Sequence, residues 1–248
     1  MLPVSSYRTM AAVLVAALPC LAVDCGRTCD DCLPCQPQRI GSSRLRPASL
    51  GWLPDPAPDS VRFVNSNGFR AALRRAPLPT PDSAGQQAAV DASNFYYLLN
   101  ENISGGCGPY FSTERRRLRY EGRNLPLTIS YALLRDFRGT YPPPSAALPD
   151  GAPLTQAVAD TLPDVLLIGF NGQPIVDIPV VRRPYRSEFQ GTRYLDSVQL
   201  VGRVFRGVYR RTVALPGSTA LQLRALYFQP GQGVVGFTYT NGEEWARF

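Results

Sequence analysis

Histidine and lysine are both missing from this chain of 248 residues, and all 26 basic residues are arginine. Without histidine, the chain cannot form a Ser-His-Asp or Cys-His catalytic centre, a histidine-ligated metal site or a histidine-based pH switch. Without lysine, it can form neither a Schiff base nor the phosphate-binding lysine of a P-loop. These two absences exclude many common enzyme classes.

An apolar run at residues 10–23 follows a single early cation, Arg8. The run is about 14 residues long, which suits a signal peptide and falls below the length needed for a membrane-spanning helix. We therefore predict a signal peptide at residues 1–24 and an exported protein. Its expected location is the cell envelope, either periplasmic or lipid-anchored at the outer membrane.

Two modes of processing compete at the end of this run. Signal peptidase prefers small residues one and three positions before its cut, which Cys20-Leu21-Ala22 provides. Alternatively, Cys25 or Cys20 becomes the lipidated first residue of a lipoprotein and attaches the chain to a membrane, although neither is preceded by a good lipobox. With Cys25 as the anchor, an even number of cysteines remains for disulfides. These are Cys29, Cys32, Cys35 and Cys107.

The cysteine spacing also resembles a metal motif. Cys25, Cys29 and Cys32 have the spacing of the radical-SAM iron–sulfur motif. That motif requires a loop after the first strand of an α/β barrel, whereas this cluster lies between an export signal and a proline-rich stretch. We therefore predict no metal and no cofactor, and keep a thiol or metal site at the cluster as an alternative.

The strongly positive net charge, +7 at neutral pH, comes partly from short arginine clusters. In a strand, Arg115, Arg117 and Arg119 would share one face, which is typical of a solvated sheet surface. Export and the lack of any helix-turn-helix, zinc-finger or RNA-recognition signature argue against nucleic acid as a partner. Anionic phosphates of the outer membrane fit a basic exported protein better.

The chain divides into a tether and one domain. Residues 25–58 hold the cysteine cluster and a stretch rich in proline, serine and arginine, which predicts a semi-extended tether. Residues 59–248 are long enough to bury one sizeable core. We therefore predict a single folded domain that begins at residue 59.

Hairpin patterns dominate that domain. Short runs of β-branched and aromatic residues alternate with turn residues, and Asn171-Gly172 suits a type I′ turn. Because consecutive hairpins are antiparallel, a parallel nucleotide-binding fold is disfavoured. We predict an all-β chain, a single antiparallel β-sandwich or barrel-like domain built from sequential hairpins, with a short helix at residues 154–162. The expected hairpins pair residues 61–64 with 69–73, 116–120 with 127–134, 165–170 with 175–181, 194–200 with 204–213, and 221–228 with 234–239.

Both ends of the domain resemble a known group of proteins. The resemblance is carried by residues 59–68 (DSVRFVNSNG), 196–209 (DSVQLVGRVFRGVY), 226–228 (LYF), 233–237 (GVVGF) and 241–245 (NGEEW). These segments are similar to strands of uncharacterised β-rich envelope lipoproteins of Gram-negative bacteria. The resemblance implies a secreted, lipid-anchored β domain, and it brings no catalytic residues.

Carboxylates are the remaining route to catalysis. A glycosidase-like hydrolase needs two carboxyl groups at a defined separation across the scissile bond. Asp177 lies between apolar neighbours, but strand alternation places it on the outer face. We therefore assign no catalytic residue and expect a structural or binding role, with a carboxylate-dependent hydrolase as the alternative. The carboxylates considered are Asp91, Glu101, Asp136, Asp164, Asp177, Glu188 and Asp196.

Overall fold

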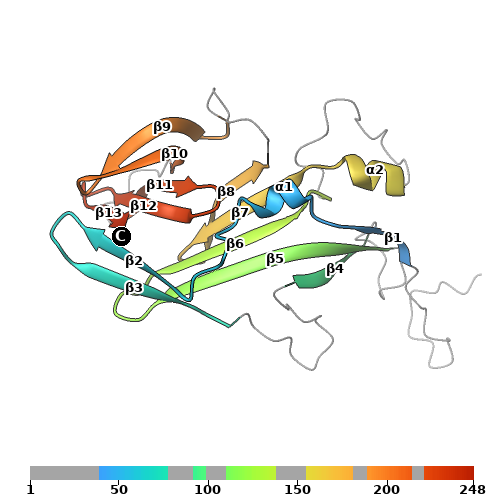
Figure 1. Ribbon diagram of the computed structural model, residues 1–248, viewed down its shortest axis with the longest axis horizontal. Coiled ribbons are helices and arrows are strands. Elements are labelled where there is room, and N and C mark those ends of the chain that lie inside the picture. Colours follow the sequence, from blue (N-terminus) through green and yellow to red (C-terminus); the bar gives the residue numbers. More distant parts are fainter. Residues whose placement is uncertain (1–38, 78–91, 99–109, 138–154, 181–188, 214–220) are drawn as a thin grey trace, which may run out of the picture.

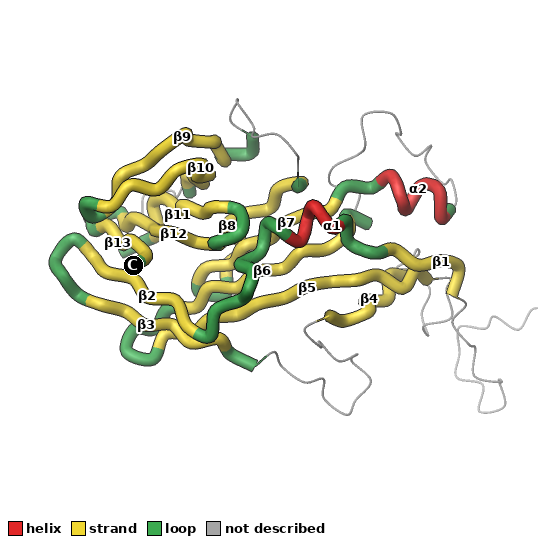
Figure 2. Tube along the Cα trace, in the orientation of Figure 1, coloured by secondary structure: helices red, strands yellow, loops and turns green. Residues whose placement is uncertain are grey.

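The computed structural model describes residues 39–77, 92–98, 110–137, 155–180, 189–213 and 221–248 (Figures 1 and 2). Most of these residues form β-strands, and nearly all the strand pairs are antiparallel. Among the described pairs, β1 and β5 alone run parallel. The prediction of an all-β, antiparallel, barrel-like domain is therefore confirmed.

Thirteen strands and two short helices make up the described fold. The helices are α1 (Pro47–Leu50) and α2 (Gln156–Thr161). The strands are β1 (Arg39–Ser43), β2 (Ser60–Asn65), β3 (Arg70–Arg75), β4 (Ala92–Leu98), β5 (Tyr110–Gly122), β6 (Thr128–Arg135), β7 (Asp164–Phe170), β8 (Gln173–Pro179), β9 (Thr192–Leu200), β10 (Arg203–Thr212), β11 (Leu223–Gln229), β12 (Gly233–Tyr239) and β13 (Glu244–Arg247). Neither helix in the described part of the chain has the length and apolarity that crossing a membrane requires.

Eleven of the strands follow one another in a nearly closed, barrel-like sheet. Their order is β8-β7-β6-β5-β3-β2-β13-β12-β11-β10-β9. The long strand β5 also pairs with β1 and β4. Because both strands pair with residues 110–113 of β5, they lie on opposite edges of β5. The pairing of β13 with β2 places the last described strand beside one of the first.

The predicted hairpins form at the predicted turns. The pairs are β2–β3, β5–β6, β7–β8, β9–β10 and β11–β12. Asn171 and Gly172 have φ angles of 49° and 78°, as a type I′ turn requires. The short helix predicted at residues 154–162 is α2.

Large side chains fill the inside of the sheet. Phe63, Phe228 and Phe237 are fully enclosed, and the ring of Phe237 stacks on Trp245 with the centroids 5.7 Å apart. The hydroxyl of Tyr131 on β6 accepts a hydrogen bond from the backbone N–H of Val234 on β12 at 2.9 Å. Strands on opposite sides of the sheet are thus joined directly across a packed core.

Residues 39–58, where the sequence predicts a tether, contain β1 and α1. Trp52 and Leu53 are buried, and the Trp52 ring lies 5.3 Å from that of Tyr209 on β10. Burial of two large apolar side chains stabilises this contact despite the proline-rich composition of the segment. The folded part of the chain therefore begins before the predicted boundary at residue 59.

A buried ion pair fixes this segment to the ends of β6 and β7. The Nε atom of Arg135 lies 3.3 Å from Oδ1 of Asp164, and both side chains are almost fully enclosed. Asp164 also accepts hydrogen bonds from the Ser49 hydroxyl at 2.6 Å and the Arg46 backbone N–H at 2.9 Å. Arg135 in turn donates to the Ser43 hydroxyl at 3.1 Å and to two backbone carbonyls. These contacts hold β1 and α1 against the sheet.

The β9–β10 hairpin covers the outer face of β12 and β13. Gly236 and Ala246 pair with each other and face away from the core, because their neighbours Phe237 and Trp245 face inward. Ala246 is nevertheless buried, as is Leu200 at the end of β9. A Cβ atom at Gly236 would lie 2.5 Å from the Leu200 Cδ1 atom, so glycine permits the close approach of the hairpin.

Candidate functional site

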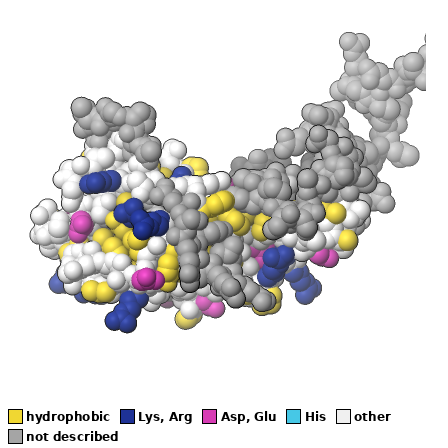
Figure 3. Space-filling model, turned by 90° about the horizontal axis from the view of Figure 1, so that it is seen from above, with side chains coloured by type: hydrophobic (Ala, Val, Ile, Leu, Met, Phe, Trp, Pro, Cys, Tyr) yellow, Lys and Arg dark blue, Asp and Glu magenta, His cyan; other side chains and the backbone are white. Residues whose placement is uncertain are grey.

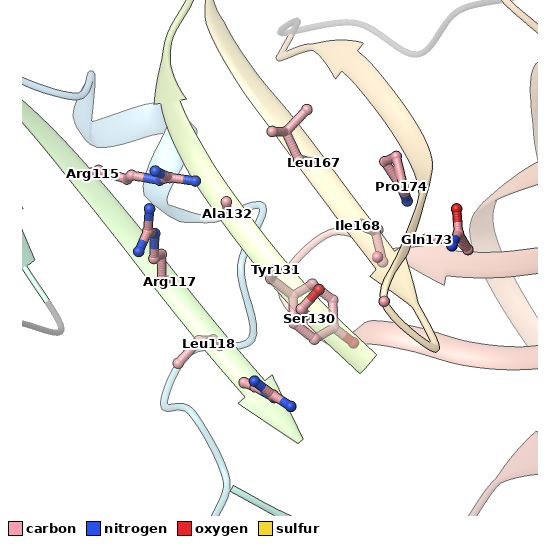
Figure 4. A pocket seen from close by; sticks show the side chains of 13 residues that line it. Arg115, Arg117, Leu118, Ser130, Tyr131, Ala132, Leu167, Ile168, Gln173 and Pro174 are labelled. Carbon is pink, nitrogen blue, oxygen red and sulfur yellow. The ribbon is translucent and has the colours of Figure 1, made fainter. Parts of the chain in front are cut away.

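Three arginines of β5 lie in a row on the outer face of the sheet. Arg115, Arg117 and Arg119 occupy alternate positions, so their Cα atoms are about 6.7 Å apart along the strand. All three are half-buried. Figure 4 shows Arg115 and Arg117 extending next to each other from β5. The prediction that these residues share one face is confirmed, but the face is only partly solvated.

Small and apolar residues lie beside this row. Strand register places Ala132 and Ser130 of β6 next to Arg117 and Arg119. On the next strand, β7, Leu167 lies beside Ala132 and Gly169 lies beside Ser130. Because the side chains of Ser130 and Ala132 are short and Gly169 has none, a cavity of about 320 Å³ remains over the sheet. We call it the arginine trough, lined by Arg115, Arg117, Leu118, Arg119, Ser130, Tyr131, Ala132, Leu167, Ile168, Gly169, Gly172, Gln173 and Pro174 (Figure 4).

The described lining of the trough contains no acidic side chain. Arg119 forms an ion pair with Glu121 at 2.7 Å, but both groups are more than 40% exposed, so the pair contributes little to stability. Arg117 has no ion-pair partner among the described residues, and burial lowers its pKa. It still carries a charge at neutral pH, because arginine stays protonated. A partly desolvated cation beside a hollow suits an anionic ligand.

The floor of the trough is rigidly supported from beneath. Tyr131 and Ile168 point into the core and are almost fully enclosed. The Tyr131 ring meets Tyr120 edge-on, with the centroids 6.1 Å apart, and its hydroxyl is held by the hydrogen bond from Val234. Burial raises the pKa of Tyr131 well above its ordinary value, so the hydroxyl stays neutral. The trough is therefore built on fixed strands.

Two other cavities each have one acidic side chain in their described lining. One of about 350 Å³ lies between the segment after α1 and β5, and its lining includes Asp55 together with Arg75, Arg116 and Arg117, so Arg117 borders both this cavity and the trough. The other, of about 370 Å³, lies over β10–β13, where Glu244 accompanies Arg210 and Arg224. The arginine trough differs from both because three cations line it without an acid among the described residues.

The carboxylates considered for hydrolysis are placed differently. Asp136 and Asp164 are fully buried, and Asp164 is engaged by Arg135 and Ser49. Asp177 lies half-buried on the outer face of β8, as alternation predicts, and Asp196 is exposed on β9. None of the three cavities has two carboxylates in its described lining. Asp91, Glu101 and Glu188 lie outside the described residues.

The predicted cysteine sites also lie outside the described residues, which include none of Cys20, Cys25, Cys29, Cys32, Cys35 and Cys107. Lipidation and disulfide formation therefore stay predictions. In the described part of the chain, no group of three potential metal ligands comes together.

Sequence reasoning found the arginine row but not the hollow beside it. The sequence signal for the hollow is a set of small residues at outward positions of β6 and β7, namely Ser130, Ala132 and Gly169. That signal acquires meaning only once the strand register is known. No protein-family model, curated protein or solved structure matches this chain.

Proposed function

We propose that this chain is an exported protein of the cell envelope, lipid-anchored through Cys25 or Cys20, whose β domain binds an anionic ligand in the arginine trough. The apolar segment at residues 10–23, the cysteines that follow it and the resemblance to envelope lipoproteins support the location. The trough supports the binding role.

One observation carries the binding proposal. Arg117 is a half-buried cation with no ion-pair partner among the described residues, and it borders a hollow floored by Ala132 and Gly169. The hydrogen bonds of a bound phosphate, sulfate or carboxylate group would replace the water that the guanidinium has lost on burial. Since Arg115 and Arg119 repeat the cation along β5, an elongated ligand with several anionic groups fits best.

A titration with a sulfated oligosaccharide tests this proposal, with an uncharged oligosaccharide of equal length as the reference ligand. Arg117→Gln removes the central charge and should weaken binding at least about tenfold, because hydrogen bonds to charged groups contribute that much. Ala132→Leu fills the floor while keeping every charge, and it should also weaken binding.

Arg206→Gln is the matched control, since Arg206 is exposed on β10 and lines none of the three cavities. The proposal predicts nearly unchanged affinity for this variant. Equal losses in the Arg206 and Arg117 variants would show attraction by overall charge alone. Full affinity in the Ala132→Leu variant would place the ligand elsewhere.

A further inference from the structure

A second surface combines exposed hydrophobic side chains with arginines. Phe69 and Val204 are 69% and 62% exposed, and Phe248 is 38% exposed. The guanidinium carbons of Arg70 and Arg203 lie 5.5 Å and 5.6 Å from the centroid of the Phe248 ring. We call these five residues the tip patch.

Two turns and the end of β13 bring the tip patch together. Phe69 follows the β2–β3 turn, where the side-chain oxygen of Asn65 accepts a hydrogen bond from the Phe69 backbone N–H at 2.7 Å. Arg203 and Val204 follow the β9–β10 turn, whose residue Gly202 has a φ of 73°. Since the β9–β10 hairpin packs over β13, its end reaches Phe248. Figure 1 shows both turns at the left end of the molecule, with β1 at the opposite end.

The charge of this region is positive. Arg62, Arg70 and Arg203 have no ion-pair partner among the described residues, and the backbone N–H of Phe248 donates to the Arg62 carbonyl at 3.0 Å. The acidic residue on the neighbouring turn, Glu243, accepts a hydrogen bond from the Asn65 side chain at 2.6 Å. At the left end of Figure 3, basic and hydrophobic side chains lie close together, with acidic side chains among them. The three arginines outnumber the two acids of the neighbouring turn, Glu243 and Glu244.

From this chemistry we infer that the tip patch binds an anionic membrane surface. Phe69 and Val204 enter the headgroup region, and Arg70 and Arg203 contact the lipid phosphates. Isolated apolar side chains among cations match an anionic lipid interface, where both insertion and charge attraction contribute. A stable protein partner would need a larger continuous patch. The inference rests on residues outside the arginine trough and stands apart from the proposed function.

Fluorescence of a Phe69→Trp variant of the full chain tests this inference locally. Trp52 and Trp245 are buried, so a tryptophan at position 69 supplies the environment-sensitive signal. With vesicles of phosphatidylcholine and phosphatidylglycerol, its emission should shift to the blue, and lipids with brominated acyl chains should quench it. With pure phosphatidylcholine both effects should be weak. Added salt should reverse them.

Sedimentation with the same vesicles measures the contribution of each residue. Every variant carries the same N-terminal segment as the parent chain, so a difference in affinity reports on the substituted residue. Arg70→Gln combined with Arg203→Gln should lower affinity roughly 30-fold, because each cation near an anionic surface contributes about a factor of five. Phe69→Ser should lower it roughly tenfold.

Arg39→Gln combined with Arg193→Gln is the charge-matched control, because it also removes two arginines, at the exposed starts of β1 and β9. The inference predicts little effect from this double control. It is overturned if the double control weakens vesicle binding as much as the double tip variant does. It is equally overturned if the Phe69→Trp emission ignores vesicles, or shifts on raising the protein concentration alone, which would indicate contact with a second copy.

Discussion

At the scale of single residues, Gly233 shows how closely the core is packed. It has a φ of 78°, and a Cβ atom there would lie 2.7 Å from the Tyr131 hydroxyl oxygen and 2.8 Å from Pro54 Cγ. Gly233→Ala should therefore lower the free energy of unfolding by about 1–3 kcal/mol through overpacking, beyond the backbone cost.

Urea denaturation measures this loss against Gly202→Ala as the control. Gly202 has a similar φ of 73°, but a Cβ atom there would meet no atom within 4 Å. The control isolates the backbone cost of a positive φ. If the two variants lose the same stability, the contact around Tyr131 and Pro54 is not tight.

Tyr209 makes stability depend on pH in the alkaline range. Burial raises its pKa to about 12, and its ring stacks on Phe228 with the centroids 5.2 Å apart. An unfolded tyrosine ionises near pH 10, so the stabilising contribution is complete below about pH 10 and is lost as the pH rises towards 12. Tyr209→Phe should reduce this loss.

Unfolding by urea at a series of alkaline pH values compares Tyr209→Phe with the parent chain. The prediction is a smaller fall in stability for the variant between about pH 10 and 12. An identical fall in both proteins would mean that Tyr209 ionises without cost in the folded state.

At the scale of elements, the Arg135–Asp164 ion pair determines whether β1 and α1 stay attached. Asp164→Asn leaves the buried guanidinium without its counter-charge and should cost about 3–5 kcal/mol of unfolding free energy. Combining it with Arg135→Met should cost less than the sum of the two single changes. Chemical denaturation of all four proteins measures the coupling, and strict additivity would contradict it.

Elements with local signals were predictable, and those with distant partners were not. The Asn171-Gly172 turn identified β7–β8 because its chemistry is contained in adjacent residues. By contrast, β1 has little alternation and pairs in parallel with β5, some 70 residues away in the sequence. The proline-rich segment around it concealed Trp52, whose aromatic partner Tyr209 lies still further along the chain.

At the scale of the whole molecule, Trp52 links the N-terminal segment to the sheet. Trp52→Ala should lower unfolding free energy by about 3–5 kcal/mol, because a large buried side chain is removed. Trp52→Phe should cost less. A thermal denaturation curve identical to that of the parent would show that residues 39–58 act as a tether after all.

The proposed anchor predicts the fate of the N-terminus. Cells grown with labelled palmitate should incorporate the label into the parent chain. The variant that replaces the lipidated cysteine, Cys25→Ser or Cys20→Ser, should lose the label, and the other variant should keep it. Mass spectrometry of the mature N-terminus would then identify the modified cysteine. A mature chain that begins at Val23 without an acyl group would contradict the lipid anchor and support cleavage by signal peptidase.

The trough itself could be predicted only in part. Alternation placed Arg115, Arg117 and Arg119 on one face, but it gave no reason to expect a hollow beside them. The hollow arises because β6 and β7 place short side chains beside the arginines of β5, and the pairing of β6 with β7 joins two separate hairpins. Alternation alone therefore predicts a solvated surface for these arginines.

The central claim is that the arginine trough binds an anionic ligand, and NMR mapping with a sulfated oligosaccharide tests it most directly. The account predicts concentration-dependent shifts of the Ala132 and Leu167 methyl signals and the Gly169 amide signal, which all lie in the trough. In the Arg117→Gln variant the same shifts should require at least about tenfold more ligand. Shifts confined to other surfaces, with the trough signals unmoved at saturation, would contradict the account.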